Sequence, residues 1–151
     1  MGAGKIMVLI SHRGNLTGPN PEKENSVVYI NEAIEEGYDV EIDVWLINDE
    51  LFLGHDYPEH KIELQFLSKN GLWCHAKNIE ALDFLMSHNM RCFWHQGDDV
   101  TLTYPDMFLW TYPNKTLTKR SICVYLDGVP TGVRDCYGVC SDHVAMLRGQ
   151  K

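Results

Sequence analysis

The chain has 151 residues, of which 44% are hydrophobic and 23% charged, and its formal net charge is −8. These values are typical of a globular protein, and we expect a single domain over residues 1–151 with a substantial core. The acidic balance and the lack of a basic cluster argue against a nucleic-acid partner, but they allow a small anionic substrate.

No membrane span is expected, because the sequence contains no run of about 18 apolar residues. The apolar run near the N-terminus leads directly into polar residues, so we expect no signal peptide. The five cysteines are odd in number and form no CxxC pair, which favours reduced thiols in a cytoplasmic protein over a disulfide framework. The oligomeric state is left open.

The first third of the chain predicts a strand, a helix and a hairpin. Ile6–Ser11 is a compact apolar run that predicts a buried strand. Apolar residues at helical spacing predict a helix over Ser26–Glu36. Tyr38–Asp56 then predicts two strands joined by a turn at Asn48-Asp49.

The rest of the chain predicts a loop with a short helix over residues 56–70, followed by one full-length helix and several strands. The helix is Asn78–Asn89, and the strands are Gly71–Lys77, Arg91–Gln96, Met107–Tyr112, Ile122–Asp127 and Tyr137–Asp142. Eight strands with mainly parallel pairing predict an α/β fold, namely a small, pared-down TIM-type (β/α)₈ barrel. Such barrels usually have about 250 residues, so several helices must be shortened or replaced by loops.

Two carboxylates two residues apart mark a candidate metal site. In a β-strand, Glu41 and Asp43 project from one face, while the aliphatic residues between and beside them project from the other. Paired carboxylate oxygens favour Mg²⁺ or Ca²⁺.

Other predicted strands repeat this pattern of one polar and one apolar face. Counting by twos places His12, His55, His75, Lys77 and His95 on polar faces near strand ends. In a parallel barrel the carboxyl ends of the strands carry the active site. By the same count, Trp110 and Tyr112 share a face, and we expect at least one of them to enter the pocket.

Four short motifs occur in a fixed order over about fifty residues. They are Ser11-His12-Arg13-Gly14, Glu24-Asn25-Ser26, Glu41-Ile42-Asp43-Val44 and Gly54-His55-Asp56. In this order they resemble the motifs of the glycerophosphodiester phosphodiesterases, a family of the phospholipase-C-like phosphodiesterases with a barrel fold. The late run GVCSDH resembles the closing strand of that family, and Phe108–Tyr112 resembles a strand with a Trp-Thr pair.

The resemblance implies a role for each matching residue. His12 and His55 would be the general acid and base, and Arg13 would contact the substrate phosphate. Glu41 and Asp43 would bind the divalent metal. Four further residues would support the site, namely Glu24, Asn25, Trp110 and Asp142. Of these, Glu24 would orient Arg13. Lys77 would contact the phosphate as a point charge. Apart from the resemblance, the predicted strand face of His95 suggests that it contacts the phosphate or the leaving group.

One strand departs from the pattern of the family. A Glu-x-Lys sequence is usual there, with its Glu as a metal ligand, and this chain has His75-Ala76-Lys77. Two interpretations stay open. Either His75 binds the metal and favours Mn²⁺ or Zn²⁺, or water and substrate complete the shell of Mg²⁺ or Ca²⁺.

The sequence therefore predicts a metal-dependent phosphodiesterase that hydrolyses glycerophosphodiesters or a related small phosphodiester. Two histidines would supply general acid and base catalysis near neutral pH. The attacking group would be water or a neighbouring hydroxyl of the substrate. The alternative is a catalytically inactive barrel that binds a phosphorylated ligand or a metal.

Overall fold

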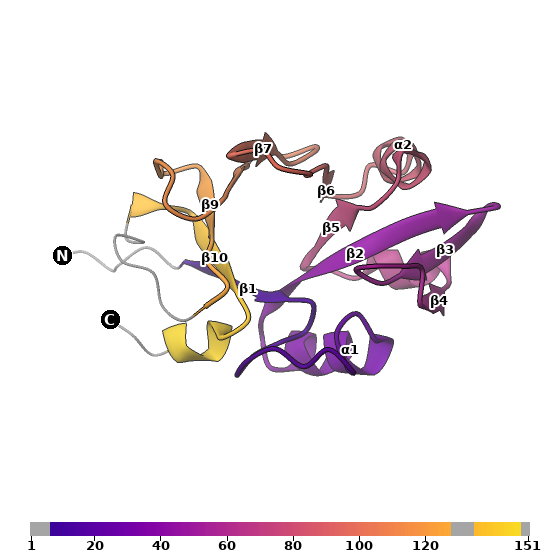
Figure 1. Cartoon of the computed structure of the whole chain (residues 1–151), viewed down its shortest axis with the longest axis horizontal. Coiled ribbons are helices and arrows are strands. Elements are labelled where there is room, and N and C mark those ends of the chain that lie inside the picture. Colours follow the sequence, from indigo (N-terminus) through magenta and orange to yellow (C-terminus); the bar gives the residue numbers. More distant parts are fainter. Residues whose placement is uncertain (1–6, 128–134, 149–151) are drawn as a thin grey trace.

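The structure, a computed structural model, describes residues 7–127 and 135–148. Its ten strands form one mixed sheet that curls into a half-barrel, and two short α-helices pack on the outer side (Figure 1). The strands are β1 (Val8–His12), β2 (Asp39–Ile47), β3 (Glu50–Leu53), β4 (His60–Ile62), β5 (Leu72–Ala76), β6 (Cys92–Phe93), β7 (Val100–Leu102), β8 (Leu109–Thr111), β9 (Ser121–Val124) and β10 (Gly138–Ser141). The helices are α1 (Val27–Glu35) and α2 (Ile79–Ser87), with 3-10 turns η1 (Leu64–Ser68) and η3 (Val144–Leu147).

The expected TIM-type (β/α)₈ barrel is wrong. Among the described residues, α-helices connect only β1 to β2 and β5 to β6. A helical crossover needs a dozen or more residues, and the segment 112–120 between the parallel strands β8 and β9 is shorter than that and has no helix. β3, β4 and β7 are antiparallel additions to the sheet. The sequence predicts a loop where β4 lies and no strand where β7 lies.

β2 is the centre of the sheet because it pairs with three other strands. Its first half pairs in parallel with β1, with Ser11 opposite Val40. Its other edge pairs in parallel with β5, with Asp43 opposite His75, and its last residues form the antiparallel hairpin with β3. Parallel pairing continues from β1 through β10 and β9 to β8, and from β5 to β6. An antiparallel bridge between Cys92 and Tyr104 links β6 to the segment after β7.

Local sequence signals account for the confirmed elements. The hairpin turn at Asn48 and Asp49 has φ angles of 50° and 64°, which these residue types tolerate well. Ser26 begins α1 by accepting a hydrogen bond from the backbone of Tyr29 at 3.3 Å. Gly37 ends this helix at a φ of 95°, where a side chain would be strained.

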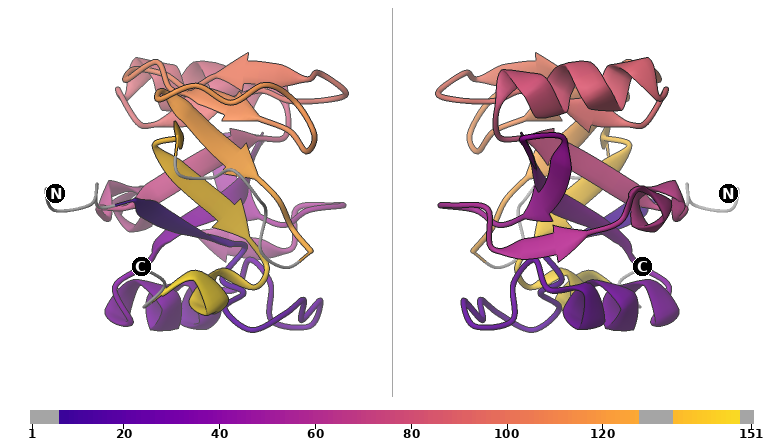
Figure 2. Two further views of the ribbon diagram at one scale, coloured as in Figure 1. Left: turned by 90° about the vertical axis from the view of Figure 1, so that its left-hand side faces the viewer. Right: turned by 90° about the vertical axis from the view of Figure 1, so that its right-hand side faces the viewer.

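Three apolar clusters pack against the sheet, and one of them joins η3 to Cys123 of β9 and Val139 of β10. On the outer face, aliphatic residues of β2 such as Val40 and Ile42 pack with the helix residues Ile30 and Leu85. On the inner face, an apolar cluster fills the concave side of the sheet; it consists of Ile10, Trp73, Phe93, Trp110, Ile122, Val124 and Cys140. Figure 2 shows α1 and α2 at opposite margins of the molecule, with the strands crossing between them. Among the described residues, no helix is long and apolar enough to cross a membrane.

Asn78 joins α2 to β2. Its Oδ1 accepts hydrogen bonds from the backbone N–H of Ala81 at 3.0 Å and of Leu46 at 3.2 Å. Its Nδ2 donates to the carbonyl oxygen of Leu46 at 2.9 Å. One side chain therefore satisfies the helix N-terminus and holds it against the central strand.

We expect Asn78→Ala to lower the free energy of unfolding by ~1–3 kcal/mol, because it removes a helix cap and leaves backbone groups of β2 unpaired. Urea denaturation followed by circular dichroism measures this. The exposed Asn70, changed to Ala, is the matched control and should shift stability by less than about 0.5 kcal/mol. Equal effects of the two substitutions would contradict the role of Asn78.

Candidate functional site

Glu41 and Asp43 of β2 point into the concave side of the sheet. Both are almost completely buried, with exposed fractions of 3% and 1%. The alternating residues Val40, Ile42 and Val44 lie in the outer core, as the strand pattern predicted. Two adjacent buried carboxylates are costly unless cations or hydrogen-bond donors compensate them.

Asp43 is well compensated. Asn25 donates from Nδ2 to its Oδ2 at 2.9 Å and accepts from the Asp43 backbone N–H at 3.0 Å. The Nε of Arg13 lies 3.2 Å from Oδ2, and the Nδ1 of His75 lies 3.1 Å from Oδ1. Burial alone would raise the pKa of Asp43, but His75, Arg13 and Asn25 hold it below its ordinary value.

Glu41 is poorly compensated. Its Oε1 lies 3.7 Å from Nε2 of His12, and its Oε2 lies 3.9 Å from Nδ1 of His75, so both ion pairs are long. Its Oε1 is buried without a hydrogen-bond partner. Burial and the neighbouring charge of Asp43 raise the pKa of Glu41. This carboxylate therefore lacks a close cation.

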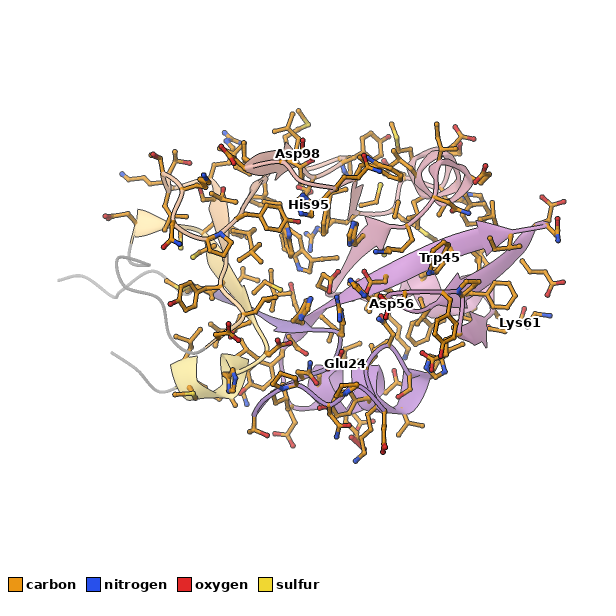
Figure 3. All side chains as sticks on the ribbon, viewed as in Figure 1. Glu24, Trp45, Asp56, Lys61, His95 and Asp98 are labelled. Atoms are coloured by element: carbon orange, nitrogen blue, oxygen red, sulfur yellow. The ribbon has the colours of Figure 1, made fainter. Side chains whose placement is uncertain are left out.

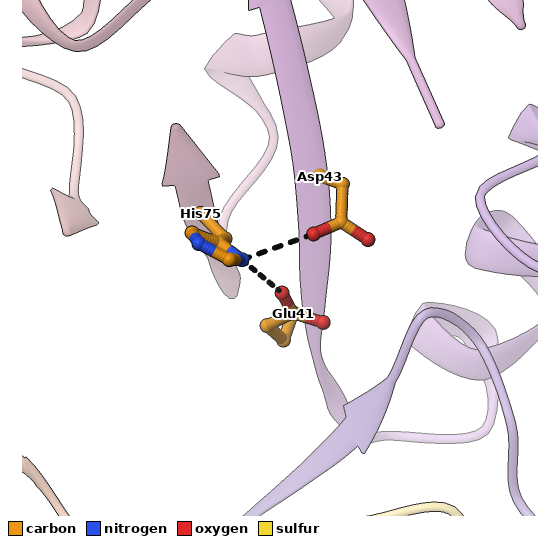
Figure 4. Close-up of side chains that lie close together, drawn as sticks. All are labelled: Glu41, Asp43 and His75. Atoms are coloured by element: carbon orange, nitrogen blue, oxygen red, sulfur yellow. Dashed lines mark hydrogen bonds and ion pairs between the residues drawn. The ribbon is translucent and has the colours of Figure 1, made fainter. Parts of the chain in front are cut away.

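His75 completes a group of three potential metal ligands (Figure 4). One ligand atom each from Glu41, Asp43 and His75 lies within 4.8 Å of the others. The His75 ring stacks on Phe93 with ring centroids 5.1 Å apart. Its Nε2 lies 3.2 Å from the carbonyl oxygen of His95. β2 and β5 position these ligands through their parallel pairing.

His12, at the end of β1, is oriented by Asp142 just beyond β10. Its Nδ1 lies 2.7 Å from Oδ1 of Asp142. Burial alone would lower the pKa of His12, but the hydrogen bond with Asp142 and the charge of Glu41 raise it overall. The pairing of β1 with β10 brings the two residues together, although they are far apart in the sequence.

Arg13 lies between two carboxylates. Its backbone φ is 60°, and its Nη1 lies 3.3 Å from Oε1 of Glu24 while its Nε lies near Asp43. The contact with Glu24 is the one expected from the sequence. Burial alone would lower the pKa of Arg13, but the charges of Asp43, Glu41 and Glu24 raise it.

Asn15 and Tyr29 also belong to the network, although no sequence motif marks them. The Nδ2 of Asn15 donates to Glu24 at 3.0 Å and to Asp142 at 2.8 Å, and its Oδ1 accepts from the hydroxyl of Tyr29 at 2.9 Å. Asn15 is fully buried and links the carboxylates that orient His12 and Arg13. Asn15 lies in a segment rich in Gly and Pro, where an asparagine predicts a turn and not a functional role.

His95 and Lys77 belong to neighbouring parts of the same interior. The His95 ring stacks on Tyr112 at 3.7 Å between centroids, and its Nδ1 lies 3.8 Å from Asp98. Burial, together with the charges of His75 and Lys77, lowers the pKa of His95. In Figure 3, the labelled His95 and Glu24 lie on opposite sides of the side chains that fill the concave face. Lys77 forms no ion pair among residues 7–127 and 135–148.

The structure does not bring every candidate residue into this network. His55 lies on the turn after β3, has a side chain 44% exposed and pairs with the adjacent Asp56 at 2.8 Å. Within the described part of the chain it forms no ion pair with His12, Glu41 or any other network residue. Trp110 packs among the apolar residues of the inner face, with its ring centroid 4.5 Å from that of Phe93.

Comparisons with protein-family models, curated proteins and solved structures found no match for this chain. The geometry of the network therefore has to support the functional argument, and the resemblance of the short motifs stays a prediction.

We expect Asp142→Asn to lower the free energy of unfolding at neutral pH by ~1–3 kcal/mol, because it weakens a buried, charge-assisted hydrogen bond. Burial alone would raise the pKa of Asp142, but His12 and Asn15 hold it below its ordinary value of 3.8. The carboxylate therefore stabilises the fold above that value, and the stabilisation is lost as the pH falls through the lower pKa of the folded state.

Urea denaturation from neutral to acidic pH should show the difference between parent and Asp142→Asn narrowing below pH 3.8. Asp83→Asn, at an exposed position of α2, is the control and should leave the pH dependence unchanged. A constant difference at every pH would contradict the ion pair.

Proposed function

We propose that this chain is a metal-dependent phosphodiesterase that cleaves glycerophosphodiesters or related small phosphodiesters, as its resemblance to the glycerophosphodiester phosphodiesterases suggests. The observation that carries the proposal is the convergence of Glu41, Asp43 and His75 with His12 and Arg13 on one concave face. Carboxylates that hold a metal, an arginine and an oriented histidine can together stabilise developing charge and transfer protons in phosphodiester cleavage.

The donor set fits a divalent cation. Two carboxylates and one imidazole supply three ligands, and the orphaned Oε1 of Glu41 is a buried acceptor that needs a positive partner. A bound ion would supply electrophilic stabilisation of the charge that develops on the phosphate oxygens.

Two cationic side chains support phosphate binding. The Arg13 guanidinium has donors directed into the network, and Glu24 and Asp43 hold it in place. Lys77 lies directly after β5, two residues beyond the metal-ligand candidate His75, and its ammonium has no ion pair within the described residues. It can therefore offer a point charge to the substrate at little cost.

His12 fits the role of general acid. Its raised pKa favours the protonated ring near neutral pH, and Asp142 fixes the ring so that Nε2 faces the metal-ligand candidates. As the oxygen of water or of a substrate hydroxyl forms a new P–O bond, the ester P–O bond breaks. The departing oxygen takes its proton from His12, and a base removes the proton of the attacking hydroxyl.

His55 is the candidate for that base, and its position also motivates the second function. Its imidazole is exposed and pairs with Asp56, outside the buried network. Within the described residues no ion pair joins His55 to His12 or to the metal-ligand candidates, and a binding protein needs no base there. This separation favours the alternative that the chain binds a phosphorylated ligand or a metal without cleaving it.

His12→Asn should reduce the turnover of a glycerophosphodiester by about 10²- to 10⁴-fold, because it removes a general acid. Product formation is measured directly by ³¹P NMR on a panel of glycerophosphodiesters and lysophospholipids, with Mg²⁺, Ca²⁺, Mn²⁺ or Zn²⁺ in separate samples. The exposed His88, changed to Gln, is the control and should retain parental turnover. Unchanged turnover in His12→Asn would overturn the assignment of the acid.

His55→Gln separates the two functions. In an enzyme that uses His55 as the base, turnover should fall by about 10²- to 10⁴-fold while substrate affinity stays close to that of the parent. A binding protein would form no product with or without His55, yet it would still be stabilised against heat by the phosphodiester. Product formation by ³¹P NMR and thermal shift in the same samples distinguish these outcomes.

A further inference from the structure

We infer that His75 is a metal ligand through Nδ1 and that the site therefore selects Mn²⁺ or Zn²⁺ over Mg²⁺ and Ca²⁺. This inference rests on the metal site of the proposed function and specifies its chemistry. It concerns which ion binds and through which atom, so it can be tested without any measurement of turnover.

The hydrogen bond at Nε2 determines how His75 presents its ring. Nε2 lies 3.2 Å from the carbonyl oxygen of His95, and a carbonyl oxygen only accepts hydrogen bonds. Nε2 therefore carries a proton, and Nδ1 is the ring nitrogen that remains to bind a metal. Metal-binding histidines commonly donate their second N–H to a backbone carbonyl in this way.

Nδ1 faces the two carboxylates of β2. Nδ1 lies 3.1 Å from Oδ1 of Asp43 and 3.9 Å from Oε2 of Glu41 (Figure 4). A proton on Nδ1 pairs with Asp43 when no metal is bound, and a divalent ion among these three side chains would replace that proton. The stacking of the ring on Phe93, with only 8° between the ring planes, holds the imidazole in this position.

The unpartnered oxygen of Glu41 also favours a divalent ion. Its Oε1 is buried without a hydrogen-bond partner, and the ion pairs of this carboxylate with His12 and His75 are long, at 3.7 and 3.9 Å. A divalent cation held by Glu41, Asp43 and His75 would supply the close positive partner that Glu41 lacks.

The nitrogen ligand determines the selectivity. Mg²⁺ and Ca²⁺ are hard ions that prefer oxygen ligands, whereas imidazole suits Zn²⁺ and similar transition metals. Mn²⁺ accepts carboxylates as readily as Mg²⁺ does and also tolerates nitrogen. A site with two carboxylates and one imidazole therefore favours Mn²⁺ and Zn²⁺.

The test begins with the metal-free wild-type protein, labelled with ¹⁵N-histidine. Long-range ¹H–¹⁵N NMR should show that adding Zn²⁺ gives His75 an Nε2–H ring with Nδ1 bound to the metal. Metal affinities follow from isothermal titration with each ion and from the loss of the free Mn²⁺ signal in electron paramagnetic resonance. Mn²⁺ and Zn²⁺ should bind at least about tenfold more tightly than Mg²⁺ and Ca²⁺.

Two variants complete the test. His75→Glu replaces the nitrogen with a carboxylate and should weaken Zn²⁺ binding by roughly 10- to 100-fold or more while Mg²⁺ and Ca²⁺ binding strengthens. His60→Gln changes a histidine that pairs with Glu59 at 3.5 Å outside the site, and it should keep the parental affinities.

An Nδ1 resonance that does not respond to metal, or equal affinity for all four ions, would overturn the inference. The wild-type spectra give this answer even if His75→Glu fails to fold. Tight Mn²⁺ or Zn²⁺ binding without turnover would support the inference and refute the phosphodiesterase. Turnover with Mg²⁺, together with a His75 resonance that does not respond to metal, would support the phosphodiesterase and refute the inference.

Discussion

The burial of two neighbouring carboxylates, Glu41 and Asp43, is the constraint on which the site depends. Burying like charges side by side costs free energy unless donors and cations surround them. Arg13, Asn25 and His75 supply these groups to Asp43, so the charge of that residue is stabilised. Glu41 receives only long ion pairs and keeps one buried oxygen without a partner. The asymmetry between the two residues indicates where a bound cation would stabilise the fold most.

Much of the site could be predicted from the sequence, because the period of a β-strand is two and does not drift. In the register that residues 40–44 adopt, the aliphatic side chains pack on the outer face of the sheet and Glu41 and Asp43 point to the inner face. A shift of the register by one residue would exchange the two sets of side chains. The same count placed His12 and His75 on the inner face, where the structure has them near Glu41. The start of α1 was also predictable, because Ser26 caps the helix at the expected position.

The rest could not be predicted because it depends on contacts that are distant in sequence or on very short elements. β4 and β7 have only three residues each, and so short an alternation is not recognisable in a sequence, so these two antiparallel strands were not predicted. His55 was assigned by parity to the inner face, but the backbone turns directly after β3. There the indole of Trp45 donates to the carbonyl of Gly54 at 2.6 Å, and His55 pairs with Asp56 near the surface.

The three partners of β2 have a consequence for how the molecule moves. Its backbone is hydrogen-bonded to β1, β3 and β5. The strand therefore cannot open without breaking the pairing with all three of these strands. Amide protons of residues 40–44 should therefore exchange with solvent only when the whole domain unfolds, whereas the turn that carries His55 can open locally. The chain thus places its charged metal-ligand candidates on the strand that we expect to exchange most slowly, and its exposed histidine on a turn that can open locally.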